Sequence, residues 1–434
     1  MPYSLHASLG NLFAGLVVCL APYSGQAQSV PAAAAVPGLA ASPAPGSSFD
    51  SAAAWLEFTE LVRMQYAYFT RPGIDGEAIL TDFKLRAQAA TTKAAFRDVL
   101  QLIAHNFADP HFIVGPLDTL DYNVVPTNSD LVAQYRDGKY TVVDVRSESE
   151  AQRQEIRPGA QVVRIDGLAP QAAVEAVMGR PLAALSGVQI DAGITIALAG
   201  RRQHTRQLTL QNGRQSRTYT LLSPEVQARL LRKDSALSTE QRGRVTVIRF
   251  NNSLGNNATI AAFREALAAA QSSAGLVLDF RNTPSGGNTT VARSIMGHFV
   301  RTEKPYQVHV VPGEERRYGV PRKFVEYVLP LAPYFGGKVL VLGGHWTGSM
   351  GEGLLVGFSA LGVPTAGSEL ADLLGALFND KLSHCDALID LGKEQLFQVN
   401  GEPRENFVPT LYRPASEGTA ERDELLEQAI RAVE

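Results

Sequence analysis

The sequence predicts an α/β protein with a largely parallel sheet, preceded by a helical region and by a β-rich region. Three apolar runs, at residues 244–250, 275–280 and 338–344, are each followed by a segment with helical spacing of apolar residues. Alternation of this kind is typical of parallel sheets that are covered by helices. The two other regions lie ahead of it in the chain.

The composition is that of an ordinary globular protein. Of the 434 residues, 45% are hydrophobic and 19% are charged, and the formal net charge is -3. No long run of Lys or Arg occurs, so the sequence indicates neither a nucleic-acid partner nor a polybasic membrane contact. A chain of this length can form two or three domains, each with its own core.

Residues 1–27 are predicted to be a secretory signal peptide. The apolar run at residues 9–22 is too short to span a bilayer easily, and residues 25–27 offer small side chains at the cleavage positions. No Lys or Arg precedes the run, so a mis-assigned start is the alternative, and Val18 disfavours a lipoprotein anchor at Cys19. The signal predicts a periplasmic or secreted protein with no stable membrane insertion after cleavage.

The next two regions are predicted to be a linker and a helical unit. Residues 28–49 are rich in Ala, Pro and Ser, a composition typical of flexible spacers. Residues 50–118 are predicted to be helical, because apolar side chains recur at helical spacing in two runs, the second behind a cap at Thr91-Thr92. The first run is Trp55, Phe58, Val62 and Tyr66, and the second is Phe96, Val99, Leu100, Ile103 and Phe107.

Residues 119–225 change to short alternating runs, which indicate β-strands. Within them, "IRPGAQVVRIDG" resembles the signature of a PDZ domain, with Ala160 where that family has Asp. The resemblance implies a PDZ-like domain that would bind an extended peptide by strand addition at a sheet edge. A β-rich insertion without a ligand is the alternative.

Cysteine and histidine usage predicts neither disulfides nor metal sites. Once the signal is removed, Cys385 is the single cysteine, and its surroundings favour a structural role. The eight histidines show no paired spacing of the kind that binds zinc. We therefore expect no metal and no cofactor.

Two glycine-rich loops form the candidate site. Residues 281–288 follow one predicted strand and residues 343–350 follow another, and in parallel sheets such loops gather along one edge, where ligands bind. Ser349 lies among glycines at the second strand-to-helix turn, a setting that can present a nucleophile, although a helix N-cap is the commoner role of such a serine.

The same loops could supply an oxyanion hole. Amides of Gly286 or Gly287, together with that of Met350, could hold a negative oxygen beside Ser349. A phosphate-binding loop is the alternative, but "PSGGN" lacks the Lys and the glycine spacing of known phosphate motifs.

Three segments together resemble landmarks of one peptidase family. They are "LVLDFRNTPSGGN", "KVLVLGGHWTGSMGEG" and "NGEPRENFVPT", in the family's order and spacing. The family is that of the tail-specific, or C-terminal-processing, serine peptidases with the tricorn protease core. The resemblance covers most of residues 50–412 and implies a crotonase/ClpP-like spiral ββα catalytic core in residues 226–434.

The resemblance implies that Ser349 is the nucleophile. The family activates this serine in two ways, and this sequence lacks the residue that one of them needs. The tail-specific branch uses a lysine some two dozen residues later, where this chain has Asp372 to Leu374. The tricorn branch uses a histidine from the helical unit with a supporting Ser and a distant Glu, which His111 and Glu405 match. Pro110 stands at the supporting Ser position, so no hydroxyl can relay between them.

Other polar residues near the loops have simpler predicted roles. His345 is a rival base, ranked second because a tight turn aims it differently from Ser349. Glu352 is expected to cap its helix, and Asp279 and Arg281 are expected to form an ion pair at a strand end.

The sequence therefore predicts a serine endopeptidase that hydrolyses exported peptides or unfolded proteins through a Ser-His, Glu-assisted acyl-enzyme. Pro110, the missing lysine and the altered tail motif, with Phe407 and Thr410 replacing the family's Gly and Asp, support the main alternative. That alternative is a binding protein on the same fold with decayed catalysis, taking a peptide or a hydrophobic ligand. A crotonase-like acyl-thioester enzyme is a third hypothesis. The oligomeric state is not indicated.

Overall fold

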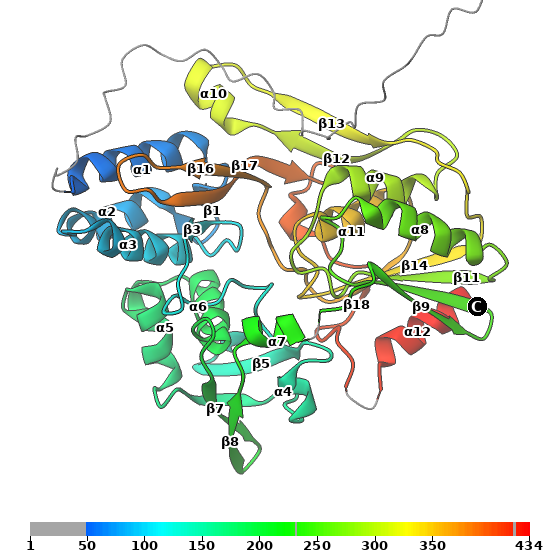
Figure 1. Cartoon of the computed structure of the whole chain (residues 1–434), viewed down its shortest axis with the longest axis horizontal. Helices are drawn as coiled ribbons and strands as arrows, with labels where there is room; N and C mark the ends of the chain where they lie inside the picture. The colour runs from blue at the N-terminus through cyan, green and yellow to red at the C-terminus, as the bar shows by residue number, and fades with distance from the viewer. Residues whose placement is uncertain (1–48, 231, 420–421) are drawn as a thin grey trace, which may run out of the picture. The chain divides into compact units, whose positions relative to one another are not determined.

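The computed structural model describes residues 49–230, 232–419 and 422–434 (Figure 1). The predicted signal peptide, Cys19 and all but the last residue of the predicted linker lie outside the described residues. Within the described ranges, no helix combines the length and the apolar character that crossing a membrane requires.

Helices form where the sequence predicts them in the first region. They are α1 (Ser51–Gln65), α2 (Gly76–Gln88) and α3 (Lys93–Asn106), with the hairpin β1 (Thr70–Arg71) and β2 (Ile74–Asp75) between α1 and α2. Side chains of Asp50, Asp75 and Thr92 accept hydrogen bonds from the first-turn amides of the three helices, which fixes where each helix begins. The apolar faces of the helices pack into one core with the β3–β17 sheet described below.

The middle region is an antiparallel sheet in the order β4-β5-β6-β7-β8. Its strands are β4 (Leu131–Arg136), β5 (Lys139–Val145), β6 (Gln161–Ile165), β7 (Arg206–Asn212) and β8 (Gln215–Leu221). The helices of this region are α4 (Glu150–Arg153), α5 (Pro170–Met178), η1 (Leu182–Ala184), α6 (Gly187–Ala199) and α7 (Pro224–Leu230). Helix α6 packs beside the edge strand β4, so that edge faces a helix and not another strand.

The predicted α/β layer is present as a sheet in the order β18-β15-β14-β11-β10-β9. All neighbours are parallel except β9, which is antiparallel to β10. The strands are β9 (Leu237–Arg242), β10 (Val245–Phe250), β11 (Gly275–Asp279), β14 (Lys338–Gly343), β15 (Thr365–Gly367) and β18 (Leu411–Tyr412). The helices are α8 (Ala258–Ala269), α9 (Thr289–Gly297), α11 (Met350–Ala360) and α12 (Glu424–Val433).

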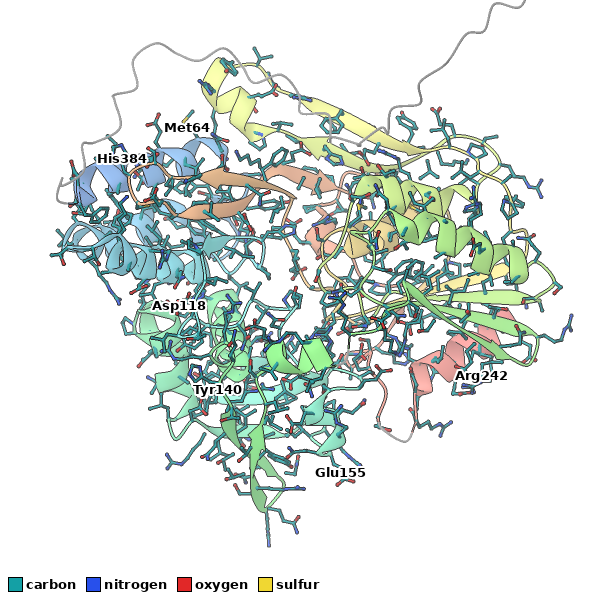
Figure 2. All side chains as sticks on the ribbon, viewed as in Figure 1. Met64, Asp118, Tyr140, Glu155, Arg242 and His384 are labelled. Carbon is teal, nitrogen blue, oxygen red and sulfur yellow. The ribbon has the colours of Figure 1, made fainter. Side chains whose placement is uncertain are left out.

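Both faces of this sheet are covered, as the continuous apolar runs require. Alternate strand residues pack against α8, α9 and α11 on one face and against α12 on the other. Arg242, labelled in Figure 2, pairs with Glu427 of α12 at 2.5 Å. The predicted ion pair between Asp279 and Arg281 is confirmed, with a buried contact of 2.8 Å.

A further antiparallel sheet was not predicted from the sequence. It contains β13 (Lys323–Val328), β12 (Lys304–Val310), β17 (Leu388–Phe397) and β16 (Ala376–Lys381), and β3 (Ile113–Gly115) also pairs with β17. Helix α10 (Pro312–Tyr318) precedes β13, and η2 (Arg404–Asn406) follows β17. Because β3 follows His111 directly, this sheet attaches the segment containing His111 to the C-terminal half of the chain. Cys385, in the turn between β16 and β17, is a buried free thiol.

Candidate active site

The two glycine-rich loops are in contact, as their positions after the neighbouring strands β11 and β14 predict. The amide of Thr283 donates to the carbonyl of Trp346 at 3.1 Å, and the amide of Gly348 donates to the carbonyl of Thr283 at 3.2 Å. These bonds continue the parallel pairing of β11 and β14 by one bridge, between Thr283 and Thr347. The loops therefore form one surface at the carboxyl edge of the sheet.

Ser349 has a strained backbone at the start of α11. Its φ is +51° and its ψ is -110°. Residues other than glycine rarely adopt this backbone conformation, which costs on the order of 1–3 kcal/mol. The residue is half-buried, and its amide donates to Glu352 at 2.9 Å, so the predicted capping role of Glu352 is confirmed. Strain of this kind is typical of turns that present a nucleophile at a helix N-terminus.

Gly286 lies directly against Ser349. Its φ is +62°, and a Cβ added to it would stand 2.4 Å from the Cβ of Ser349 and 3.0 Å from its hydroxyl oxygen. Only glycine leaves room for the serine side chain here. The Gly286 amide donates to the carbonyl of Thr283 at 3.0 Å, so it is already used within the turn.

Two other amides, unlike that of Gly286, have no acceptor within the described ranges and are free to donate to an oxyanion. In the described part of the chain, no hydrogen bond is found from the amide of Gly287 or from that of Met350. Met350 is the first residue of α11, where amides have no acceptor within the helix. The two loops thus offer one unoccupied amide each, and the Met350 amide directly follows the serine.

Glu352 and Arg404 form hydrogen bonds with the backbone of Ser349 and so stabilise the serine turn. Glu352 is buried, accepts from the amides of Ser349 and Leu373 at 2.9 Å each, and lies 3.5 Å from the Arg404 guanidinium. Arg404 also donates to the carbonyls of Ser349, at 3.3 Å, and of Leu373. Burial raises the pKa of Glu352 to about 7, against the opposing effect of Arg404. This pair joins the turn at residue 349 to the loop at residues 372–375.

His111 contacts the other side of that loop. Its Nδ1 lies 3.0 Å from the carbonyl oxygen of Leu374. A carbonyl can only accept, so in the neutral ring Nδ1 carries the proton and Nε2 keeps a lone pair. The carboxylate of Asp109 accepts from the amides of His111 and Leu374, at 2.9 and 3.1 Å, which fixes the two segments together.

Burial determines the titration of both groups in this segment. It lowers the pKa of His111 to about 4, although the Leu374 carbonyl acts in the opposite direction. It raises the pKa of Asp109 to about 6, against the effect of the hydroxyl of Tyr66, which donates to it at 2.7 Å. His111 is therefore a neutral imidazole at neutral pH.

The structure brings the predicted site residues to one region but does not join all of them. Among the described residues, no hydrogen bond connects His111 with Ser349 or with Glu405. The link between His111 and Ser349 runs through the backbone at residues 373–374. Glu405 is half-buried on η2, and burial raises its pKa. The rival base His345 instead contacts Asp144 of β5, with its Nδ1 2.9 Å from the carboxylate.

Sequence reasoning missed the role of Arg404. The residue was visible in "GEPRENF" beside Glu405, but a buried arginine cannot be recognised without knowing what it packs against. Burial of Glu352 and Arg404 together, at 2% and 4% exposure, is the signal that the structure adds.

Comparison with solved structures supports this fold, whereas comparison of the sequence with family models and with curated proteins gives no match. The photosystem II D1 C-terminal processing protease is 16% identical, with a TM-score of 0.54 over 88% of this chain and 97% of that one. Mature CPAF complexed with lactacystin is 13% identical, with a TM-score of 0.57 over the same shares. The chain thus has the mixed α/β fold of these two proteins, which confirms the predicted resemblance at the level of fold.

Proposed function

We propose that the chain is a serine endopeptidase with Ser349 as its nucleophile. The observation that carries the proposal is the strained turn at Ser349, which directly precedes the amide of Met350 at a helix N-terminus and lies against Gly286, the neighbour of Gly287. Among the described residues, no hydrogen bond from the amide of Met350 or Gly287 is found. A positive helix end and two amide donors favour an oxygen that becomes negative during acyl transfer. Structural similarity to a C-terminal processing protease, over 88% of this chain, supports the same conclusion.

In the proposed first step, the hydroxyl oxygen of Ser349 attacks the scissile carbonyl carbon. Its proton passes to Nε2 of His111, and the resulting oxyanion accepts from the amides of Gly287 and Met350. When the carbon–nitrogen bond breaks, the leaving amine takes the proton from the imidazolium. Water then repeats the sequence on the acyl-enzyme and releases the acid.

This step requires the ring of His111 to reach Ser349 when substrate is bound. The Leu374 carbonyl already sets the tautomer that such a base needs, since it leaves Nε2 free to accept. A low pKa keeps the base unprotonated but makes the imidazolium costly, by about 1.4 kcal/mol for each unit of pKa. We assign Glu405, together with the other carboxylates near the ring, to the stabilisation of that cation.

The remaining regions are assigned in the same proposal. Residues 50–118 form the helical unit that supplies His111, and residues 226–434 form a crotonase/ClpP-like core. Residues 119–225 form a PDZ-like domain, in which the edge strand β4, beside α6, would bind an extended peptide. The substrates are exported peptides or unfolded proteins, and residues 1–27 direct the protein to the periplasm or outside the cell.

Hydrolysis of an unfolded protein tests this function. The wild-type chain should cleave reduced, alkylated casein, and Ser349→Ala should abolish the cleavage while leaving the circular dichroism spectrum unchanged. Ser359→Ala, ten residues further along α11, is the matched control and should retain activity. If Ser349→Ala cleaves as fast as the wild type, Ser349 is not the nucleophile. If no variant cleaves but all bind the substrate, the chain is a binding protein.

A further inference from the structure

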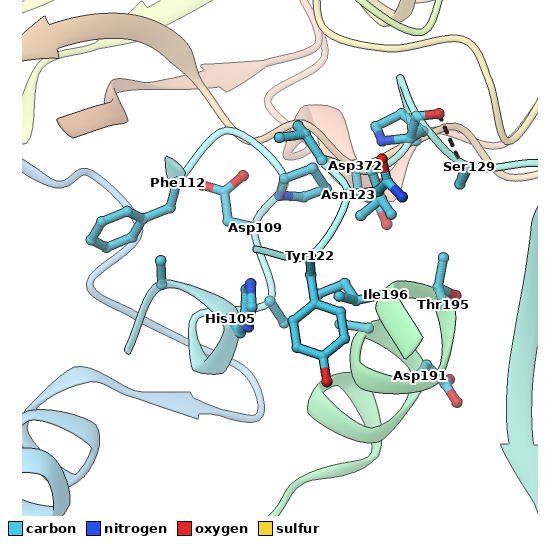
Figure 3. Close-up of a pocket in the computed structure, with 18 of the residues that line it drawn as sticks. His105, Asp109, Phe112, Tyr122, Asn123, Ser129, Asp191, Thr195, Ile196 and Asp372 are labelled. Atoms are coloured by element: carbon cyan, nitrogen blue, oxygen red, sulfur yellow. Dashed lines mark hydrogen bonds between the residues drawn. The ribbon is translucent and has the colours of Figure 1, made fainter. Parts of the chain in front are cut away.

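A cavity of about 310 Å³ opens beside the candidate active site. Its wall is built from α3 and the segment after it, from β4 and α6, and from residues 369–372 of the C-terminal half (Figure 3). Most of the lining is apolar, including Val132 on β4, Ile196 on α6 and Leu370. A cavity of this size and lining is suited to a side chain or a small ligand.

The charged groups in the wall are all of one sign. Among the lining residues, which the structure describes in full, there are five carboxylates and no Lys or Arg; the acids are Asp109, Asp121, Asp191, Glu369 and Asp372. Three of them are already engaged. Asp109 accepts from two amides and from the hydroxyl of Tyr66, Asp121 accepts from the amide of Asp118 at 2.6 Å, and Asp191 pairs with Arg136 at 2.8 Å.

Glu369 and Asp372 face the cavity from its C-terminal side with acceptor capacity to spare. Glu369 is about half exposed and uses one oxygen to accept from the hydroxyl of Tyr412 at 2.6 Å. Asp372 is exposed, and no hydrogen bond to its carboxylate is found among the described residues. Removal from bulk water by the surrounding protein, and then the charge of Glu352, raises the pKa of Asp372 to about 7.

His345 adds a buried acceptor to the same wall. Its side chain is 92% buried, and its Nδ1 lies 2.9 Å from the carboxylate of Asp144 and 3.0 Å from the hydroxyl of Ser368. Because a carboxylate only accepts, Nδ1 carries the proton in the neutral ring and Nε2 is left as an acceptor. Nothing described hydrogen-bonds to Nε2, and its nearest charged neighbour is Glu369 at 3.7 Å. Ser368 does not form a catalytic triad with His345 and Asp144, because its hydroxyl contacts Nδ1, the same nitrogen that contacts the carboxylate, and not Nε2.

We propose that this cavity binds a Lys or Arg side chain of the polypeptide substrate. The inference rests on the proposed peptidase function and specifies its substrate class. The apolar wall would cover the methylene stem, and the cationic head would donate to the acceptors of Glu369, Asp372 and His345. A free peptide carboxylate would meet like charge there and would be excluded.

The nearest cations do not replace such a ligand. Arg136 is paired with Asp191, and Arg201 lies over the ring of Tyr122 at 4.8 Å. Arg71 donates to two backbone carbonyls, those of Phe107 and Ala108, at 3.0 Å. None of the three lines the cavity, although Arg71 lies close enough to Asp372 to lower its pKa, as does Arg404.

Binding of matched peptides to the full-length Ser349→Ala protein tests the proposal without requiring turnover. The probes are fluorescein-labelled Ala-Leu-Ala-X-Ala-Leu-Ala amides, with X as lysine, norleucine, arginine, citrulline or glutamate. Lysine is thus compared with a neutral side chain that has the same four carbons, and arginine with a neutral side chain of the same length. We expect lysine and arginine to bind about tenfold more tightly than norleucine and citrulline, and glutamate to bind most weakly.

Variants then locate the effect. Glu369→Gln should reduce the lysine-over-norleucine preference several-fold, whereas Glu265→Gln, an exposed acid on α8 outside the lining, should leave it unchanged. Equal affinity for lysine and norleucine would overturn the proposal. So would tighter binding of the same peptide with a free C-terminal carboxylate, or a preference that survives Glu369→Gln together with Asp372→Asn. Failure of the peptidase function alone would appear instead as basic selectivity without cleavage by the wild type.

Discussion

Replacing Gly286 by alanine should disable Ser349 directly. The new methyl carbon would stand 2.4 Å from the serine Cβ, about 1 Å closer than an ordinary contact allows. Because Gly286 also has a φ of +62°, alanine would add backbone strain of about 1 kcal/mol. The serine would have to move by about 1 Å, a displacement that can reduce catalysis about a hundredfold.

A second glycine separates the clash from the backbone strain. Gly213 has a φ of +59°, but a Cβ there would meet nothing within 4 Å. Gly213→Ala should therefore cost about 1 kcal/mol of stability and leave activity unchanged. Gly286→Ala should lose about a hundredfold in kcat/KM, whatever its thermal stability.

The assay is hydrolysis of a quenched fluorescent peptide, with thermal unfolding followed on the same samples. Wild-type activity in Gly286→Ala would refute the close approach of Gly286 to Ser349. An equal loss of activity in both variants would show that backbone strain, and not the contact with the serine, is responsible.

Three further outcomes are expected. The kcat/KM of the wild type should stay level on acidification until the pH approaches 4, because protonation of His111 removes the base and burial lowers its pKa to about 4; an acid limb near 6.5 would contradict this. Glu352→Gln should remain active, because its amide oxygen still accepts from Ser349 and Leu373, whereas Glu352→Ala should lower stability by about 3 kcal/mol in urea unfolding, since two buried amides lose their acceptor. Arg404→Gln should lower stability by about 3 kcal/mol above pH 7, because the ionised Glu352 is then buried without its cation. The loss should be smaller below pH 7, where Glu352 can protonate, and a loss independent of pH would argue against the pair.

The α/β layer was predictable from the sequence because its strands are buried on both faces. Continuous apolar runs such as "GLVLDF" and "KVLVLGG" have few other stable environments, and glycine-rich loops mark where they end. The meeting of the loops at residues 283 and 347 followed from the parallel order of β11 and β14.

The β3–β17 sheet could not be predicted in the same way. Strand β17 mixes polar and apolar residues, and its partner β3 lies more than two hundred residues earlier in the chain. Strand pairing over such separations depends on tertiary packing and not on local pattern. The contact of His111 with Leu374 depends on this sheet, so the sequence could place His111 in the site only through a family resemblance.

Polar contacts inside the site were the least predictable part. Glu352 was correctly expected to cap its helix, but the same carboxylate also accepts from Leu373 and faces Arg404. Motif spacing describes the backbone turn at Ser349. It contains no information about which buried charges from other segments support that turn.

The most direct test of the central claim, an activated hydroxyl at residue 349, is labelling of the intact protein with a fluorophosphonate probe, mapped by mass spectrometry. We predict a single adduct on Ser349, formed much more slowly in His111→Gln, which keeps a polar side chain but cannot accept the proton as imidazole does. Absence of labelling, an adduct on another residue, or an unchanged rate in His111→Gln would contradict the account.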